Sequence, residues 1–249
     1  MLKKFRSRSL ITATARVPDG MRIYAIGDVH GRIDLLTDLF ARIDSDRRNL
    51  PTGKTLHVFL GDYVDRGFHS REVVEAMIAR GQQCPSVFLK GNHEAYLIEF
   101  LANPSVLAAW RLFGGMATLA SYGLTPTPIP DEDESGALSL ALNRAMPFSH
   151  RNFLARLELS FTCGDFFFVH AGVRPGRRLA KQSENDLLWI REDFLVNEKP
   201  YEKVVVHGHT PVMEADLRSN RINIDTGAYA TGRLTCLVLE GDTKRIIGT

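Results

Sequence analysis

The chain has 249 residues, of which 44% are hydrophobic and 24% are charged. These values are typical of a globular protein with one large domain or two small ones, long enough to bury a core without disulfides. The net charge of +2 gives no general attraction to nucleic acid or to acidic membranes, and no apolar run approaches the ~18 residues of a membrane span. We therefore expect neither a nucleic-acid partner nor a membrane partner. The sequence does not indicate an oligomeric state.

Two further features bear on location. Cys84, Cys163 and Cys236 lie far apart with no CxxC pair, which predicts reduced thiols and a cytoplasmic protein. The N-terminus carries four basic residues, but the apolar stretch after them is too short for a secretory signal. We interpret residues 1–20 as a mobile basic arm, with docking to an anionic surface as the alternative, and 21–249 as a single domain.

The first hundred residues alternate between strand and helix patterns. Apolar runs predict buried strands over 22–26, 55–60 and 86–89. Apolar residues at helical spacing predict helices over 32–47, after Ser70 as the N-cap, and over 94–102.

The pattern then becomes helical. Residues 104–123 read as helix with a break at the pair Gly114-Gly115, 125–134 as an extended solvated loop, and 136–158 as helix. We expect the whole insert, about 95–158, to form a small helical cap over one side of the site.

The second half is rich in strands. Segments 159–163 and 166–169 flank Gly164-Asp165, a strong hairpin signal. Further strands are predicted over 204–206, 221–225, 233–240 and 244–247, and the last two are joined by a turn at Gly241-Asp242.

Polar motifs follow the first three predicted strands. They are Gly27-Asp28-Val29-His30-Gly31, Gly61-Asp62-Tyr63-Val64-Asp65-Arg66-Gly67 and Gly91-Asn92-His93-Glu94. Asp28 and Asp62 are 34 residues apart, and Asp62 and Asn92 are 30 apart, close to the length of a βαβ unit. Parallel strands at that spacing bring all three motifs to one edge of a sheet, where open α/β sheets bind ligands.

The potential ligands after apolar runs combine oxygen and imidazole donors without a thiolate. They are Asp28, His30, Asp62, Asn92, His170 and His209. This donor set suits Mn²⁺, Fe or Zn²⁺. Six ligands exceed the needs of one open site but suffice for two ions that share a carboxylate, and a water between two cations becomes a nucleophile for phosphorus near neutral pH. No GxSxG or comparable nucleophile motif is present in the sequence.

The neighbouring polar residues suit phosphate chemistry. The planar fork of Arg66 can grip phosphate oxygens. His93 is placed to protonate a leaving oxygen, and Asp65 could hold that imidazole in one tautomer and raise its pKa.

These motifs resemble those of the calcineurin-like metallophosphoesterases and, within them, the phosphoprotein phosphatases. The resemblance extends over residues 22 to about 240 through three further motifs: His170-Ala171-Gly172, Gly208-His209-Thr210-Pro211 and Asp225-Thr226-Gly227-Ala228. It implies an α/β fold, the metallophosphoesterase-type four-layer β-sandwich flanked by helices. The chain is most similar in length and motif ends to bacterial and phage serine/threonine protein phosphatases.

The resemblance also implies roles for single residues. Asp28, His30 and Asp62 would hold the first metal ion. Asp62, Asn92, His170 and His209 would hold the second, with Mn²⁺ as the first choice and Fe or Zn²⁺ as alternatives. His93 with Asp65 would be the general acid pair, and Arg66 and Arg191 would bind phosphate. His209 is favoured over His207 as the ligand, and Lys90 stands where the family usually has arginine, which loses a bidentate fork.

The implied activity is hydrolysis of phosphate monoesters on phosphoserine and phosphothreonine proteins by a hydroxide that bridges two metal ions. One alternative is a symmetrical dinucleoside tetraphosphate hydrolase, which would need places for two bases; Trp110, Phe113 and Tyr122 are either such places or helix core. An inactive phospho-binding scaffold is the alternative of another class, and the retention of every ligand and of His93 argues against it.

Overall fold

The computed structural model of the protein describes residues 15–127 and 132–249. Two five-stranded sheets form its centre. The first sheet has the order β10-β9-β1-β2-β3, with β1 (Met21–Ile26), β2 (Lys54–Phe59), β3 (Ser86–Phe88), β9 (Thr235–Glu240) and β10 (Thr243–Gly248). The second has the order β4-β5-β6-β8-β7, with β4 (Ser160–Cys163), β5 (Phe166–Val169), β6 (Val204–His207), β7 (Asp216–Leu217) and β8 (Arg221–Asn223).

Strand direction brings the polar motifs together. β1, β2 and β3 pair in parallel, with Ile26 opposite Phe59 and Phe59 opposite Phe88. β5, β6 and β8 are likewise parallel neighbours in the second sheet. The predicted placement of the first three motifs along one sheet edge is thus confirmed, as is the antiparallel hairpin of β4 and β5.

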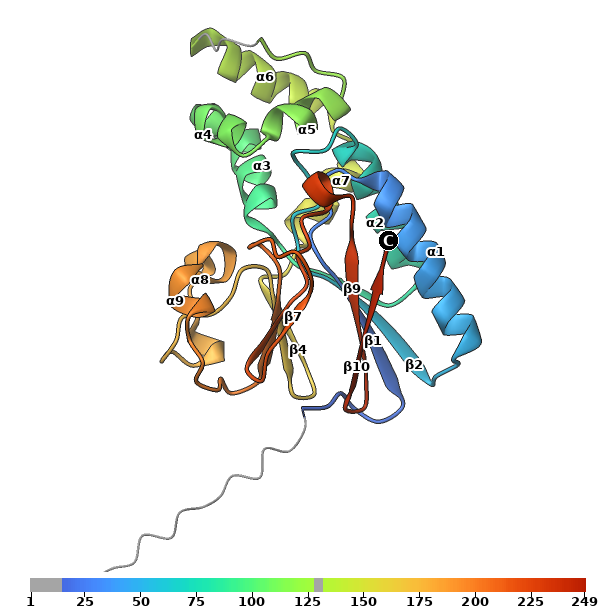
Figure 1. The fold of residues 1–249 in the computed structure, drawn as a ribbon. Helices are drawn as coiled ribbons and strands as arrows, with labels where there is room; N and C mark the ends of the chain where they lie inside the picture. The colour runs from blue at the N-terminus through green and yellow to red at the C-terminus, as the bar shows by residue number, and fades with distance from the viewer. Residues whose placement is uncertain (1–14, 128–131) are drawn as a thin grey trace, which may run out of the picture.

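The protein has four layers, as predicted. Figure 1 shows α1 (Ile33–Asn49) and α2 (Ser70–Gln83) on one side, the two sheets in the middle, and α8 (Glu184–Trp189) with α9 (Glu192–Leu195) on the other side. An apolar cluster that includes Ile23, Val58, Phe168 and Ile222 fills the space between the sheets. This follows from the sequence, because strands buried on both faces are almost continuously apolar.

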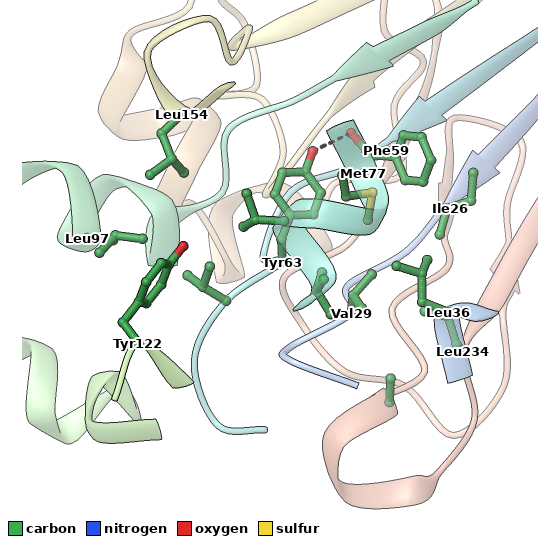
Figure 2. Close-up of a cluster of buried hydrophobic side chains, with 14 of the residues drawn as sticks. Ile26, Val29, Leu36, Phe59, Tyr63, Met77, Leu97, Tyr122, Leu154 and Leu234 are labelled. Carbon is green, nitrogen blue, oxygen red and sulfur yellow. Dashed lines mark hydrogen bonds between the residues drawn. The ribbon is translucent and has the colours of Figure 1, made fainter. Parts of the chain in front are cut away.

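A second apolar cluster joins the first sheet to its helices and to the cap (Figure 2). Tyr63 lies near its middle, and its hydroxyl donates to the carbonyl of Leu89 at 2.6 Å. A third cluster, with Phe167 and Phe194, joins the second sheet to α8 and α9. Each sheet is therefore packed on both faces, which fixes the positions of the loops at its strand ends.

The cap is a series of short helices above the sheet edge (Figure 1). They are α3 (Asn92–Ala102), η1 (Pro104–Val106), α4 (Leu107–Leu112), α5 (Gly115–Ser121), α6 (Glu132–Ala145) and α7 (Phe148–Ala155). The predicted break at Gly114-Gly115 is confirmed, because Gly114 has a left-handed φ of 95°. The predicted helix over 136–158 is divided between α6 and α7, with Pro147 as the N-cap of α7.

Two local predictions were wrong. Part of the predicted loop, from Glu132 onward, belongs to α6; residues 128–131 of that loop lie outside the described residues. Ser70 is not the cap of α2 but its first residue. Its hydroxyl accepts the backbone N–H of Asp65 at 3.0 Å instead.

The predicted mobile arm, residues 1–20, includes residues 15–20, which the structure describes. Residues 1–14 lie outside the described residues, and the role of an arm there stays a prediction. Val17 is only 1% exposed and its N–H donates to the carbonyl of Gly241 at 2.9 Å. Its apolar side chain belongs to the core between the sheets, so the mobile segment cannot extend to residue 20.

Several short elements escaped prediction: α8, α9, α10 (Ala228–Thr231), η2 (Leu179–Lys181) and β7. Each has six residues or fewer, too few to show a period in the sequence. Within 15–127 and 132–249, no helix combines the length and the apolar character that crossing a membrane requires.

Candidate metal centre

The predicted site lies on loops with unusual backbone conformations. Left-handed φ angles occur at five residues other than glycine: His30 (47°), Asp62 (53°), Asp65 (70°), Arg66 (69°) and His209 (68°). No other non-glycine residue in 15–127 and 132–249 has a positive φ. Such a conformation costs about 1–2 kcal/mol per residue, so the surrounding structure must hold it in place.

Glu94 provides much of that support. Its buried carboxylate accepts the backbone N–H groups of Asp62 and Tyr63, both at 2.8 Å, and of Gly91 at 2.9 Å. Burial and the nearby charge of Asp62 raise the pKa of Glu94 to about 7. The motif Gly91-Asn92-His93-Glu94 therefore contains a residue that fixes the second loop, a role that the sequence did not reveal.

The first group of potential ligands comprises Asp28, His30 and Asp62. His30 Nδ1 lies 2.9 Å from the carbonyl of Val64, which can only accept, so Nδ1 carries the proton and Nε2 a lone pair. That Nε2 lies 3.5 Å from Asp62 Oδ2. Asp28 Oδ2 accepts the N–H of His209 at 2.9 Å, whereas Asp28 Oδ1 is buried without a hydrogen-bond partner.

The second group comprises Asp62, Asn92, His170 and His209. Asn92 Oδ1 lies 2.8 Å from His170 Nε2 and 2.9 Å from His209 Nδ1. His170 Nδ1 donates to the carbonyl of Leu60 at 2.9 Å, so its Nε2 also presents a lone pair, 3.4 Å from Asp62 Oδ1. Two acceptors that face each other repel in the absence of a cation, and the donor set therefore fits a divalent metal ion.

The electrostatics support the same assignment. Burial lowers the pKa of His30 to about 3 and of His209 to about 2, so both imidazoles are neutral, as metal ligation requires. Burial, Asp225 and Asp62 raise the pKa of Asp28 well above its usual range. Burial also favours protonation of Asp62, but the attraction of the neighbouring histidines outweighs it and lowers the pKa of Asp62; of these histidines, His93 is the one whose raised pKa lets it carry the charge. Three buried carboxyl groups so close together are costly unless cations compensate them.

Two glycines make room for this concentration of oxygen atoms. A Cβ on Gly208 would collide with Asp28 Oδ1, and a Cβ on Gly91 would collide with Asp62 Oδ1. The glycine in each motif is therefore needed because a carboxylate lies directly against its backbone.

His93 and Asp65 form a buried pair that the cap holds in position. His93 Nδ1 lies 2.7 Å from Asp65 Oδ2. Trp110 of α4 donates its indole N–H to Asp65 Oδ2 at 2.8 Å, and Thr118 of α5 donates its hydroxyl to Oδ1 at 2.6 Å. Burial lowers the pKa of His93, but Asp62 and the hydrogen bond with Asp65 outweigh this effect, and the net pKa is raised. A raised pKa keeps the imidazole protonated and suits a general acid.

The two arginines each contact a histidine of the cluster. Arg66 Nη2 is 3.3 Å from His93 Nε2, and its guanidinium covers the ring of Tyr229 at 4.5 Å. Arg191 is exposed and donates from Nε to His209 Nε2 at 3.1 Å. Both guanidinium groups are thus close enough to reach an anion bound beside the ligand groups.

His207 and Lys90 have other partners. His207 is fully buried against the ring of Phe194, at 4.8 Å between centroids, and takes no part in the ligand cluster, whereas His209 does. Lys90 forms an ion pair with Glu184 at 2.8 Å.

The structure brings all ten predicted site residues into one connected cluster, in which each contacts at least one other: Asp28, His30, Asp62, Asp65, Arg66, Asn92, His93, His170, Arg191 and His209. Sequence reasoning missed the supporting residues Glu94, Trp110, Thr118, Asp225 and Tyr229. Glu94 and Asp225 belong to quoted motifs and Trp110 was named as an aromatic candidate, but Thr118 and Tyr229 had no signal in the sequence. A hollow of about 610 Å³ lies away from the cluster and is lined by Arg47, Arg80 and Cys84 among others.

Comparisons with known proteins identify the family of this chain. The family model of the calcineurin-like phosphoesterases matches residues 21–232. The chain is 28% identical over 231 residues to the bis(5'-nucleosyl)-tetraphosphatase PrpE (asymmetrical) of Anoxybacillus flavithermus, covering 85% of this chain and 88% of that protein.

Two solved structures show the same fold. One is a proposed diadenosine tetraphosphatase, with a TM-score of 0.59, 20% identity and 95% coverage of both chains. The other is a protein serine/threonine phosphatase from Saccharomyces cerevisiae, with a TM-score of 0.52, 15% identity and coverage of 92% of this chain and 79% of that one. At these identities the likeness concerns the fold alone.

Proposed function

The chain belongs to the calcineurin-like phosphoesterase family, and on this premise we propose that it hydrolyses dinucleoside tetraphosphates. As a member of that family it is a metal-dependent phosphoester hydrolase. Our first expectation from the sequence was a serine/threonine protein phosphatase. The substrate proposed here is instead that of the alternative, a dinucleoside tetraphosphate hydrolase.

A cluster of half-buried aromatic rings beside the ligand groups carries this choice. Tyr96 and Phe113 are stacked at 5.0 Å between centroids, and Trp189 meets them at 5.5 and 5.8 Å. Phe113 lies 6.0 Å from the ring of His93, and Trp189 lies 6.3 Å from that of His209. Aromatic faces at this position can stack on a nucleobase, whereas a phosphoserine side chain offers no ring for them.

The sequence offered Trp110, Phe113 and Tyr122 as candidates for stacking on a base, and the structure gives them different places. Trp110 and Tyr122 are buried and bond to Asp65 and His150, so they belong to the core. Phe113 alone of the three faces the site. Trp189 follows 76 residues later and could not be linked to it from the sequence.

The names of curated relatives support the same substrate class. Relatives from Anoxybacillus flavithermus and from Halalkalibacterium halodurans, the latter 26% identical, are both named as asymmetrical tetraphosphatases. An asymmetrical enzyme splits diadenosine tetraphosphate into a mono- and a triphosphate, whereas the symmetrical enzyme that we first considered gives two diphosphates. We therefore propose asymmetrical cleavage.

We assign roles to the site residues accordingly. Asp28, His30 and Asp62 would hold one ion, and Asp62, Asn92, His170 and His209 a second, with Mn²⁺ as the first choice. When bound, two such ions polarise the phosphoryl group and activate water. Arg66 and Arg191 orient the phosphates, and His93, held by Asp65, gives a proton to the leaving oxygen.

A phosphoserine and phosphothreonine protein phosphatase is the second candidate. The exposed position of Arg191 favours it, because a guanidinium at the surface is open to a phosphate carried on a protein. In that case a phosphoprotein would be the partner. The three cysteines, all free thiols, fit a cytoplasmic protein under either proposal.

One experiment separates the candidates. We would measure kcat/KM with Mn²⁺ for diadenosine tetraphosphate and for a phosphothreonine peptide in one buffer and identify the nucleotide products by chromatography. We expect the nucleotide to be preferred by more than about tenfold, a difference of about 1.4 kcal/mol in transition-state binding, with AMP and ATP as products. A preference for the peptide would contradict the proposal, and two ADP molecules would contradict asymmetrical cleavage.

A further inference from the structure

A hollow of about 350 Å³ opens beside Arg66, between the loop that follows β2 and helix α10. It is lined by Arg32, Ile33, Asp34, Arg66, Gly67, Phe68, His69 and Tyr229. Neither the proposed roles nor the aromatic cluster of Tyr96, Phe113 and Trp189 accounts for it. Ligand pockets range from about 300 to 1,000 Å³, so a hollow of this size suits one small ring system and not a whole dinucleotide.

Two aromatic side chains border the hollow and remain accessible. Phe68 is 74% exposed, although burial of a Phe side chain would stabilise the protein. Tyr229 is 41% exposed, and one edge of its ring packs on His30 at 5.5 Å between centroids. An exposed aromatic pair at the rim of a pocket is typical of a surface that binds a ring.

The charge of the hollow comes from one arginine. Arg32 is neutralised by Asp34, to which it donates at 2.6 and 2.9 Å. Within 15–127 and 132–249, no carboxylate forms a salt bridge with Arg66, whose guanidinium contacts the ring of Tyr229 and the imidazole of His93. The hollow thus has aromatic walls at its rim and a guanidinium without a direct carboxylate partner where it meets the candidate metal centre.

We propose that this hollow, bounded by Phe68 and Tyr229, holds one nucleobase of the substrate while Arg66 binds the adjoining phosphate. The proposal rests on the proposed function, because it assigns a place to one end of a dinucleoside tetraphosphate. The aromatic cluster of Tyr96, Phe113 and Trp189 then takes the other end. Removing a ring that stacks on a base weakens binding roughly 5- to 150-fold.

The test compares two exposed phenylalanines. Phe68→Ala removes the proposed stacking ring, and Phe148→Ala removes a ring that is 76% exposed at the start of α7, outside the site. For each variant we would measure kcat/KM for diadenosine tetraphosphate and for inorganic tetraphosphate, which has the same P–O–P bonds without the nucleosides. We expect the ratio of the two values to fall about tenfold in Phe68→Ala and to stay within twofold of the wild type in Phe148→Ala. An unchanged ratio in Phe68→Ala would overturn the proposal.

Binding provides a second measurement that does not depend on turnover. The dissociation constant of AMP should rise about tenfold in Phe68→Ala, while that of inorganic phosphate should not change. Tyr229→Leu should weaken AMP binding, and Tyr229→Phe, which keeps the ring over Arg66, should restore it. An equal loss of AMP and phosphate binding would show that the rings act only by positioning Arg66, and the proposal would be wrong.

The two proposals fail in different ways. If the wild type does not cleave diadenosine tetraphosphate but AMP binding still depends on Phe68, the proposed function is wrong and the nucleobase site stands. If the wild type cleaves the dinucleotide and neither the ratio nor AMP binding responds to Phe68→Ala, the function stands and the nucleobase site is wrong.

Discussion

Two partly or fully buried groups of charges in this protein are built on opposite plans. On the outer face of the first sheet, Asp46 accepts the hydroxyl of Tyr24 at 2.8 Å and both arms of Arg245 at 3.0 Å. Nearby, Arg22 donates twice to Glu240, at 2.7 and 2.9 Å. Every carboxylate there meets a donor or a cation of its own chain.

The candidate metal centre lacks that balance. Asp28 and Asp62 lie among neutral imidazoles, several lone pairs face one another, and the backbone beneath is strained. The comparison teaches how to distinguish two kinds of buried charge. A cluster whose charges match stabilises the fold, whereas a cluster of acceptors is arranged for a cation from outside.

The largest effect is expected from Asp62→Asn. Because Asp62 faces both ligand groups, its loss should reduce kcat by about 1,000-fold or more and reduce the metal content measured by mass spectrometry. The metal-free variant should be at least as stable as the metal-free wild type, since the charge of Asp62 raises the pKa of Asp28 and Glu94. If the wild type kept full activity after exhaustive chelation, the acceptor cluster would not be a metal site and the contrast with the charge-matched cluster would be wrong.

His93→Asn should lower kcat by ~10²–10⁴-fold on substrates with poor leaving groups. The loss should be smaller for p-nitrophenyl phosphate, whose leaving group needs little protonation. Metal content should be unchanged, because the His93 imidazole is bonded to Asp65 and neither proposed ligand group includes it. Equal losses on alkyl and aryl phosphates would argue against His93 as the acid.

Thr118→Val tests whether the cap positions the acid pair. It removes the 2.6 Å hydrogen bond to Asp65 and leaves a buried carboxylate oxygen without its donor, at a cost of about 1–3 kcal/mol in unfolding free energy. We expect kcat to fall about tenfold with little change in KM, because a misplaced His93 impairs proton transfer more than binding. Ser139→Ala is the control: it removes a cap hydrogen bond to the carbonyl of Phe100 and should lower stability without changing kcat.

Asp46→Asn is expected to have no effect on activity. It breaks the charge-matched cluster formed by Asp46, Tyr24 and Arg245. The variant should be about 1–3 kcal/mol less stable at pH 7. Burial raises the pKa of Asp46, but the hydrogen bonds from Arg245 and Tyr24 outweigh it and lower the net value below that of the unfolded chain. A lowered pKa gives stability that is present above about pH 4 and lost as the pH falls through the folded value, so the two proteins should converge in acid. A difference that persists in acid, after Asp46 is protonated, would show that packing, and not charge, is lost.

The sequence predicts those parts of the molecule in which a repeated pattern coincides with a layer. Apolar runs gave the parallel strands, and a polar motif at each strand end gave ligands that the fold brings together. Helices with a clear apolar period, such as α1, were predicted within two residues at each end.

What escaped prediction depends on contacts between distant segments. Trp110 looked like core or a base platform because its pattern cannot show that the indole N–H meets Asp65, 45 residues earlier. Ser70 resembled a cap in sequence, but its hydroxyl is used by the loop that Asp65 occupies. Tyr229 and Arg66 are separated by most of the chain, so their contact, and the hollow beside it, needed the fold.

The bonds from the cap to Asp65 also bear on protein engineering. A cap transplanted from a relative to alter specificity must supply an indole N–H and a hydroxyl at the positions of Trp110 and Thr118. Chimeras that lack either donor should fold around the sheets yet release their leaving groups slowly. The helical insert is therefore not freely exchangeable, because any replacement has to keep the two side chains that anchor it to the acid pair.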